Sequence, residues 1–430
     1  MFEYVASGLS HTRIKKIILR ELYRKNNKDA TIVAINSMLK SINQEHHKLS
    51  VLFNAYQEAN VGRIFNEIYY KDSIEHIYSD SGGLQMLTLG HTSTDELKNK
   101  VYKVQSDLSH VGLCFDEMPV VLQDGQRSST TNMSFRYYDS NILEQKARET
   151  GVNIRTQIEH FKSNSNNKCK VLLILQGNCF DTYQRWSDIL MEEIGIDNWQ
   201  YVKGIASGGA ALGQGTLEDF KRTFYSTKIA LPSEIKIDHY HLLGVGSLHR
   251  MLPMLALRKN NTIDDSVLVS YDSTTHTGGI SRGNYFMNDK MNIFPHYKGK
   301  AFYDTFNNIN ENLTKLKLPY QLNEDHLYAR ISKPSEWDKK FAGNAFAEFT
   351  TFYGYLISSV YNFMNSVDSL YKDDTFYDKY SNEKNLYLPL KAYSQCRDMI
   401  DFAEWEKCFN QVLDTNKVNV VQKNSIDDFF

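Results

Sequence analysis

Acidic side chains end three of the short apolar runs in this 430-residue chain. Asp80 follows His-Ile-Tyr-Ser, Asp116 follows Val-Gly-Leu-Cys-Phe, and Asp272 follows Val-Leu-Val-Ser-Tyr. An ionised carboxylate can attack an electrophilic carbon, and a protonated one can supply a proton to a leaving group. The alternative is that these residues only mark turns and cap the helices that follow. The pattern indicates an acidic site, provided that the fold brings the run ends together.

The short runs alternate with longer amphipathic segments. Strands are expected at 50–54, 76–79, 111–115, 170–175, 201–206, 239–245 and 266–271, and helices at 94–108, 140–161, 180–194, 217–225 and 248–257. This alternation is typical of βαβ units with a parallel sheet. It favours an α/β fold, a (β/α)8 barrel with inserted loops whose eighth strand is not located, and a doubly wound sheet is the alternative. In a barrel the carboxyl ends of the strands meet on one face, where catalytic residues collect.

Composition and charge narrow the class of protein. Apolar residues make up 41% and charged residues 23% of the chain, which is typical of a globular protein. The 49 basic and 51 acidic residues give a net charge of −2, so nucleic acid would have to be bound by a local basic patch. The 5 scattered cysteines fit a reducing compartment better than a disulfide framework. With no secretory signal and no apolar stretch near the roughly 20 residues that span a bilayer, we expect a cytoplasmic protein.

Five short motifs follow one another between Ser79 and Asp272. They are Asp80-Ser-Gly-Gly-Leu-Gln85, Cys114-Phe-Asp-Glu-Met-Pro119, Leu175-Gln-Gly177, Gly204-Ile-Ala-Ser-Gly-Gly-Ala-Ala-Leu-Gly213 and His241-Leu-Leu-Gly-Val-Gly246. In this order they resemble the signature segments of the tRNA-guanine transglycosylase superfamily. In character the chain looks most like the phage and bacterial transglycosylases that put 7-deazaguanines into DNA. The resemblance implies a pentosyltransferase that exchanges guanine for a 7-deazaguanine without breaking the sugar-phosphate chain.

The resemblance also implies a nucleophile and a proton shuttle. Asp272 would attack the sugar C1′ and form a covalent glycosyl-enzyme, and Asp80 would pass a proton to the departing base and take one from the incoming base. The segment between Gly246 and Asp272 is longer than in the bacterial family. Asp264 and Asp265 therefore compete with Asp272 for the nucleophile's role, and otherwise they belong to a helix-to-strand turn.

The remaining motifs would bind the base. Asp116 can accept two hydrogen bonds from the N1–H and amino group of guanine, and Gln176 and the backbone N–H of Gly209 can donate to its O6. Leu84 and Leu243 stand where the family places side chains that sandwich the flat base, and core packing is an equally good interpretation of both. The candidates for base binding are Ser81, Leu84, Asp116, Gln176, Gly208, Gly209, Ala210 and Leu243.

Two features depart from the family. Its bacterial zinc motif, Cys-x-Cys-x2-Cys with a distant histidine, does not occur, so we expect neither a metal nor another cofactor. Gln214 replaces a glutamate that is linked to a cationic aminomethyl group, which suggests a neutral substituent, as in 7-cyano-7-deazaguanine (preQ0), or plain guanine exchange. His239 and His241 share one strand face; we interpret them as ordinary strand histidines, with a metal pair as the alternative.

Two basic stretches are candidates for contact with nucleic acid. Residues 13–28 carry many basic side chains and Glu21 as the one acidic residue. The segment 273–300 interleaves aromatic residues with the basic candidates Arg282, Lys290, Lys298 and Lys300. Basic groups beside aromatic faces suit a backbone and a splayed base, and the target base has to be flipped out or single-stranded.

The resemblance favours DNA as the substrate, with the same chemistry on tRNA as the first alternative. A catalytically silent partner subunit and a metal-dependent barrel hydrolase are the other hypotheses. We expect a barrel domain at 1–330 and a helical extension at 331–430 packed on it. Phe349–Leu370 is the clearest amphipathic helix of that extension, and because the comparable helix helps to build a dimer in the family, a homodimer is a further hypothesis.

Overall fold

The computed structural model describes the strands and helices that build the site. The described residues are 2–7, 36, 48–58, 74–83, 93–122, 135–138, 140–208, 216–276, 284–287, 290–293, 345–375, 378 and 387–420. The basic stretch at 13–28 and the expected domain boundary near residue 330 lie outside them.

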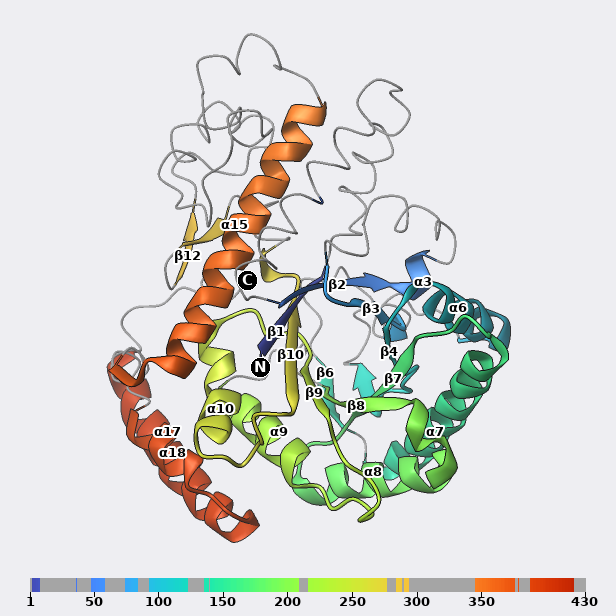
Figure 1. Ribbon diagram of the computed structural model, residues 1–430. Helices are drawn as coiled ribbons and strands as arrows, with labels where there is room; N and C mark the ends of the chain where they lie inside the picture. Colours follow the sequence, from blue (N-terminus) through green and yellow to red (C-terminus); the bar gives the residue numbers. More distant parts are fainter. Residues whose placement is uncertain are drawn as a thin grey trace.

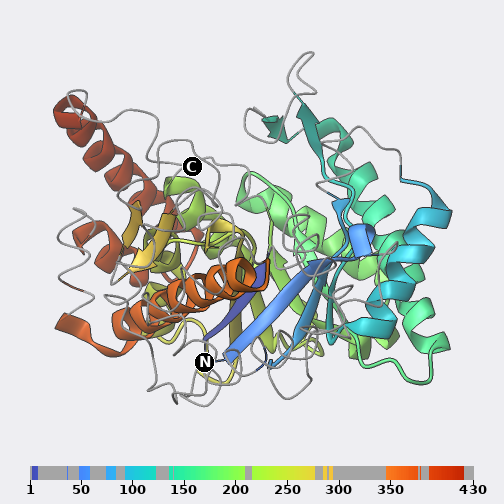
Figure 2. The ribbon, with the colours of Figure 1, turned by 90° about the horizontal axis from the view of Figure 1, so that it is seen from above.

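Eight parallel strands close into a barrel (Figure 1, Figure 2), in the order β1-β10-β9-β8-β7-β4-β3-β2. The strands are β1 (Phe2–Ser7), β2 (Lys48–Asn54), β3 (Ile77–Asp80), β4 (Val111–Leu113), β7 (Lys170–Leu175), β8 (Val202–Ser207), β9 (His239–Leu242) and β10 (Leu268–Ser273). The (β/α)8 barrel is therefore confirmed, and the doubly wound sheet is wrong.

The strand that the sequence pattern did not locate is β1. It lies between β10 and β2, with Phe2 beside Val269 in one parallel register and Glu3 beside Lys48 in the other. Glu3 is fully buried, accepts a hydrogen bond from Ser50 Oγ, and lies with Oε1 3.0 Å from His76 Nδ1. A charged side chain in a six-residue run hides the apolar pattern by which strands are recognised.

Some strand ends differ from the sequence expectation. β9 ends at Leu242 instead of Val245, because the chain turns at Gly244, whose φ of 71° is strained for residues with a side chain. β4 ends at Leu113 instead of Phe115. β10 runs on to Ser273, so Asp272 lies inside the strand and not after it.

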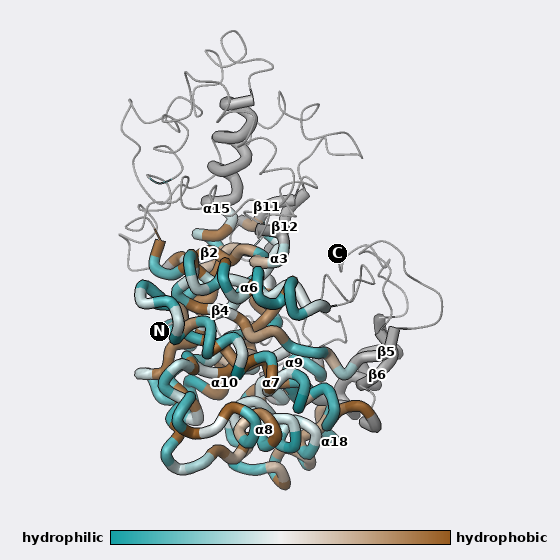
Figure 3. The backbone as a smooth tube through the Cα atoms, turned by 90° about the vertical axis from the view of Figure 1, so that its right-hand side faces the viewer, coloured by the Kyte–Doolittle hydropathy of each residue, from teal (hydrophilic) through white to brown (hydrophobic). Residues whose placement is uncertain are grey.

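Helices cover the outside of the barrel (Figure 2). Those that follow the strands are α3 (Ala55–Glu58), α6 (Asp95–Leu108), α7 (Ser140–Ser163), α8 (Phe180–Ile194) with the 3-10 turn η1 (Ile196–Tyr201), α9 (Thr216–Lys228) and α10 (Leu248–Lys259). α6 begins where Thr94 Oγ1 accepts from the Leu97 N–H over 3.3 Å. The helices alternate between hydrophilic and hydrophobic residues (Figure 3), as expected when one face packs on the strands.

Within the described residues, antiparallel strand pairs are inserted after the carboxyl ends of two barrel strands. The pair β5 (Val120–Leu122) and β6 (Phe135–Tyr138) follows β4, and the pair β11 (Asn284–Met287) and β12 (Lys290–Ile293) follows β10. The backbone N–H of Phe286 donates to Ser359 Oγ over 2.8 Å, which ties the second hairpin to a C-terminal helix.

In the described part of the C-terminal region, the helices α15 (Ala345–Lys372), α17 (Tyr387–Ser394) and α18 (Met399–Val420) pack on the barrel and its helices. Phe363 of α15 contacts Tyr4 and Tyr271, with ring centroids 5.9 and 5.8 Å apart. α9 carries the contact to α18, where Phe224 stacks on Phe402 at 4.4 Å. None of the helices in the described residues has the length and apolarity needed to cross a membrane.

Candidate active site

Three aspartates lie at the carboxyl-terminal end of the barrel. Asp80 is the last residue of β3, Asp116 follows β4, and Asp272 is the last but one residue of β10. Because the strands are parallel, these positions share one face of the barrel. Asp80 interacts electrostatically with both of the others. The fold therefore brings together the three carboxylates that the sequence singled out.

Asp80 is held by the neighbouring strand and by its own loop. Asn54, its register partner on β2, donates from Nδ2 to Asp80 Oδ2 over 3.2 Å. Burial raises the pKa of Asp80 to about 6, and the charge of Asp272 adds to this rise. The backbone N–H groups of Ser81 and Gly82 oppose the rise. A carboxyl group that titrates there can exchange a proton with a bound base near neutral pH.

Asp116 forms a buried pair with Gln176. Gln176 Nε2 donates to Asp116 Oδ2 over 2.6 Å, and both side chains are buried. Burial raises the pKa of Asp116 to about 7, while the hydrogen bond from Gln176 opposes the rise. The pair places a carboxylate and a side-chain amide next to each other at this end of the barrel, and both kinds of group can hydrogen-bond to the polar edge of a flat ring.

Glycines allow the backbone to approach this pair closely. A Cβ added at Gly83 would lie 3.2 Å from the carbonyl oxygen of Asp116, so the loop after Asp80 packs directly against it. A Cβ added at Gly208 would lie 2.9 Å from the Leu175 carbonyl oxygen and 3.1 Å from Gln176 Nε2. A side chain at either position would push apart the loops that follow β3 and β4, or those that follow β7 and β8.

Asp272 is anchored through one oxygen. The backbone N–H of Gly244 donates to Oδ1 over 3.0 Å, and His241 Nε2 lies 3.4 Å from the same oxygen. The residue is 8% exposed. Gly244 reaches this position because its positive φ turns the chain directly after β9.

Asp264 and Asp265, the competing nucleophiles, are not part of this group. Both lie in the turn between α10 and β10, at the opposite end of β10 from Asp272. Asp264 Oδ1 accepts from the Ser266 N–H over 2.7 Å, and Asp265 Oδ1 lies 3.2 Å from Arg258 Nε. Their contacts are those of a structural turn.

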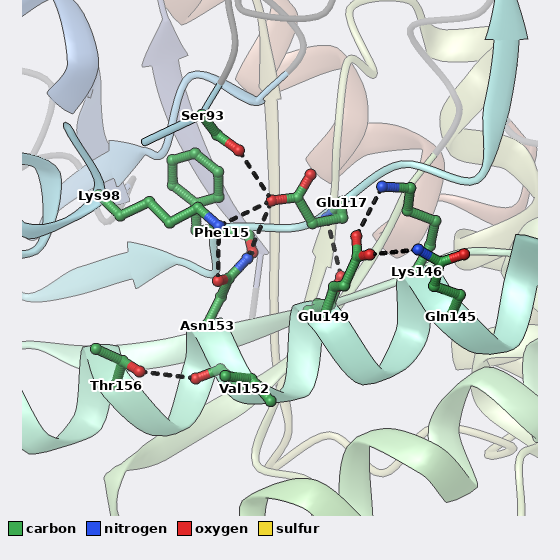
Figure 4. A network of polar contacts seen from close by, with 11 residues as sticks. Ser93, Lys98, Phe115, Glu117, Gln145, Lys146, Glu149, Val152, Asn153 and Thr156 are labelled. Carbon is green, nitrogen blue, oxygen red and sulfur yellow. Dashed lines mark hydrogen bonds and ion pairs between the residues drawn. The ribbon is translucent and has the colours of Figure 1, made fainter. Parts of the chain in front are cut away.

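A polar network that the sequence analysis missed supports Asp116 from outside the barrel (Figure 4). Lys98 Nζ lies 3.1 Å from Glu117 Oε1, and Asn153 Nδ2 donates to the Phe115 carbonyl over 3.2 Å and to Glu117 over 3.3 Å. The Glu117 N–H donates to Thr150 Oγ1 over 2.9 Å. The residues on both sides of Asp116 are therefore fixed to α6 and α7. The acidic pair Asp116-Glu117 was the only sequence signal for it.

The other predicted base-binding residues are described in part. Ser81 is buried and its Oγ accepts from the Gly83 N–H over 3.4 Å. Leu243 is half-buried after β9 and packs against the core. Leu84, Gly209, Ala210 and Gln214 lie outside the described residues, as do Arg282, Lys298 and Lys300 among the nucleic-acid candidates. Lys290 begins β12, and its side chain is not described.

His239 and His241 are buried in the interior of the barrel, as strand histidines. Each has a ring nitrogen 2.6 Å from Ser270 Oγ. Burial lowers the pKa of His239, and the neighbouring His241 adds to this. Within the described part of the chain, no three His, Cys, Asp or Glu side chains are grouped so that they could hold a metal ion.

The chain matches no protein-family model and no curated protein. The resemblance to the guanine transglycosylases therefore rests on the five motifs. The closed barrel is compatible with that family and not specific to it.

Proposed function

We propose that the chain is a base-exchange transglycosylase that replaces guanine in DNA by a 7-deazaguanine, through a covalent glycosyl intermediate on Asp272. The observation that carries the proposal is the grouping of a buried Asp116–Gln176 pair with Asp80 and Asp272 at one end of the barrel. Two carboxylates suffice for glycoside cleavage. A third carboxylate paired with an amide would supply an edge that binds the departing base and then the incoming base.

The first half-reaction cleaves the bond to guanine. An oxygen of Asp272 forms a bond to C1′ as the C1′–N9 bond breaks, and the base leaves with the bonding electron pair. The Asp80 carboxyl group transfers its proton to the departing base, which leaves as neutral guanine. Asp116 accepts from the N1–H and the amino group, and in the bound state Gln176 would donate to O6.

The second half-reaction reverses these steps with another base. Asp80, now a carboxylate, takes the N9 proton of the incoming 7-deazaguanine. The N9 electron pair forms the new bond to C1′, and the bond to Asp272 breaks to restore its carboxylate. No atom is gained or lost by the protein, so neither a cofactor nor an oxidant is needed.

DNA is proposed as the substrate because the chain departs from the tRNA-acting pattern. The bacterial zinc motif is missing, and Gln214 replaces the glutamate linked to a cationic substituent. A neutral incoming base, 7-cyano-7-deazaguanine, fits this change. Exchange on tRNA uses the same chemistry, so the experiment has to distinguish DNA from tRNA as the substrate.

The test is transfer of a labelled base into nucleic acid. Purified protein is incubated with labelled guanine or 7-cyano-7-deazaguanine and with duplex DNA, single-stranded DNA or unmodified tRNA. Label should enter DNA with the wild type and not with Asp272→Asn. Asp264→Asn, the same chemical change in the turn before β10, is the matched control and should keep transfer. A denaturing gel should show a protein–DNA adduct in the wild type when no incoming base is supplied.

Each of the other outcomes contradicts a part of the proposal. Label that enters tRNA alone would place the chain with the tRNA enzymes. Transfer lost in Asp264→Asn and kept in Asp272→Asn would overturn the assignment of the nucleophile. Neither transfer nor adduct with any nucleic acid would contradict the enzyme and favour a silent subunit.

A further inference from the structure

A chain of buried polar groups leads from Asp272 into the interior of the barrel. His241 Nε2 lies 3.4 Å from Asp272 Oδ1, and His241 Nδ1 lies 2.6 Å from Ser270 Oγ. Ser270 Oγ also lies 2.6 Å from His239 Nε2. Both histidines and Ser270 are at most 1% exposed. Barrel interiors are usually filled by branched apolar side chains. A row of polar side chains at this position is therefore unusual and indicates a function for it.

The strand register explains why these side chains meet. Ser270 on β10 is the register partner of His241 on β9, and Leu268 is the partner of His239. Side chains alternate along a strand, so Ser270 and Asp272 share one face, as His239 and His241 do. Tyr78 of β3 stacks on the His241 ring, with centroids 5.6 Å apart and planes 25° apart. The stack restrains the plane of the ring, and Nε2 lies 3.4 Å from Asp272 Oδ1 without a hydrogen bond in this structure.

The donor and acceptor groups of these side chains determine which nitrogen of each histidine carries its hydrogen. A neutral imidazole has one N–H and one acceptor nitrogen. If His241 carries its hydrogen on Nε2, it can donate to the ionised Asp272, and its Nδ1 then accepts from the Ser270 hydroxyl. The Ser270 oxygen in turn accepts from His239 Nε2–H. With the opposite order, a bare Nε2 would face an anionic oxygen, which is repulsive.

Both contacts fall on the same oxygen of Asp272. The Gly244 N–H donates to Oδ1, and His241 Nε2 approaches Oδ1 as well, whereas Oδ2 has no hydrogen bond from the described residues. The 3.4 Å contact is longer than a hydrogen bond in the free protein, and contacts of this kind commonly tighten when substrate binds. One oxygen is anchored and the other is left to react.

We propose that His241 is a positioning residue for Asp272: together with the Gly244 N–H it holds Oδ1, so that Oδ2 is the oxygen that attacks, and Ser270 and His239 fix the His241 tautomer that this requires. The part concerning attack on C1′ rests on the proposed transglycosylase. The part concerning the tautomer does not.

The tautomer is measured first, because it needs no activity. Histidine is labelled with ¹⁵N, and the His241 resonances are identified by their loss in His241→Phe. The ring nitrogens of wild-type His241 should show the pattern of an Nε2–H tautomer with Nδ1 as acceptor. In Ser270→Ala this preference should weaken. A wild-type Nδ1–H tautomer would overturn the proposal.

The kinetic test separates positioning from stability. His241→Phe keeps the ring on Tyr78 and removes the donor, so kcat should fall about 10- to 100-fold, the range found when the hydrogen-bond partners that orient metal ligands are removed. The KM for the base should stay within about twofold, because Asp116 and Gln176 follow other strands. His241→Gln keeps an N–H at the end of the side chain and should recover part of the loss.

The matched control is His276→Phe. His276 is also fully buried and its Nδ1 also lies 3.0 Å from a serine hydroxyl, that of Ser359, but it packs against α15 and not inside the barrel. It should lower the melting temperature without lowering kcat at a temperature where the variant is folded. Equal losses of kcat in His241→Phe and His276→Phe, or no loss in His241→Phe, would overturn the positioning role. If the wild type transfers no base to any nucleic acid, the proposed function fails, and the tautomer alone then decides this inference.

Discussion

Gln176 and Asp116, 60 positions apart in the chain, form a hydrogen bond of 2.6 Å inside the barrel mouth. β4 and β7 are neighbours in the sheet, with Leu113 beside Leu172, so residues shortly after the two strands meet. The bond favours the ionised carboxylate, and burial opposes ionisation more strongly, which leaves the pKa of Asp116 at about 7. The state of this pair therefore changes over the physiological pH range.

Base affinity should depend on pH through Asp116. Only the ionised carboxylate accepts both the N1–H and the amino group of guanine, so affinity should rise as pH increases through about 7. We expect binding to be about tenfold weaker at pH 6 than at pH 8. Calorimetric titration with guanine between these values measures the effect. Asp116→Asn should bind weakly at every pH, and equal wild-type affinities at pH 6 and pH 8 would contradict the assignment.

Asp116→Asn should stabilise the protein in alkaline solution. The folded-state pKa of about 7 lies above the ordinary value of 3.8, so the folded protein binds the proton more tightly than the unfolded chain. The stabilisation by this proton is fully present below pH 4 and is lost as pH rises through about 7. Asparagine removes that loss, and the free energy of unfolding at pH 8 should rise by about 2–4 kcal/mol, with no gain at pH 4.

Denaturant unfolding at pH 4 and pH 8 measures the free energy of unfolding of Asp116→Asn. Asp264→Asn is the control, because the pKa of Asp264 is shifted in the opposite direction. Hydrogen bonds from Ser266 lower the pKa of Asp264, so its ionised form stabilises the folded state at pH 8. The substitution there should give no gain at either pH. A gain at pH 8 in both variants would mean that net charge, and not the buried site, sets the effect.

Asp80→Asn should impair proton transfer and spare binding. The general acid contributes about 10²- to 10⁴-fold to such a reaction, and the Asp116–Gln176 pair that would hold the base is unchanged. Single-turnover release of guanine from DNA should slow by that factor, while guanine affinity at pH 8 stays within a few-fold. In the wild type the rate should decline as pH rises above about 6, where Asp80 loses its proton. The same decline in Asp80→Asn would assign the proton to another group.

Lys98→Met should weaken the restraint on the segment that carries Asp116. The Lys98–Glu117 pair is half-buried, with side chains 15% and 19% exposed, and its loss removes about 1 kcal/mol of restraint from the segment that carries Asp116. We expect guanine affinity to fall about fivefold. Lys100→Met is the matched control on the same helix, since Lys100 pairs with an exposed Glu96. An equal loss in the two variants would attribute the effect to charge alone.

Much of the fold and the grouping of the acids could be predicted from the sequence, because strand ends are marked by local composition. The runs ending at Asp80 and near Asp116 and Asp272 are apolar and short, and parallel strands bring such ends together. β1 could not be predicted, since Glu3 is buried by partners, Ser50 and His76, that lie far along the chain.

The contacts that depend on register also escaped prediction. Whether His241 lies beside Ser270 is decided by the alignment of β9 with β10, and a slip of one residue would turn the side chains to the other face. The Lys98–Glu117–Asn153 network joins a loop to two helices in the same way. Alternation along one strand reveals which residues share a face, and it does not reveal their neighbours on the next strand.

The position of β1 sets the order in which the barrel can form. The first strand of the chain pairs with the last barrel strand, Phe2 with Val269, so this seam has the longest sequence separation in the barrel. Such non-local pairing slows folding. During synthesis β1 and β9 keep open edges until β10 leaves the ribosome, and open strand edges are templates for association between chains. Chains interrupted before Leu268 should therefore aggregate instead of folding as a partial barrel.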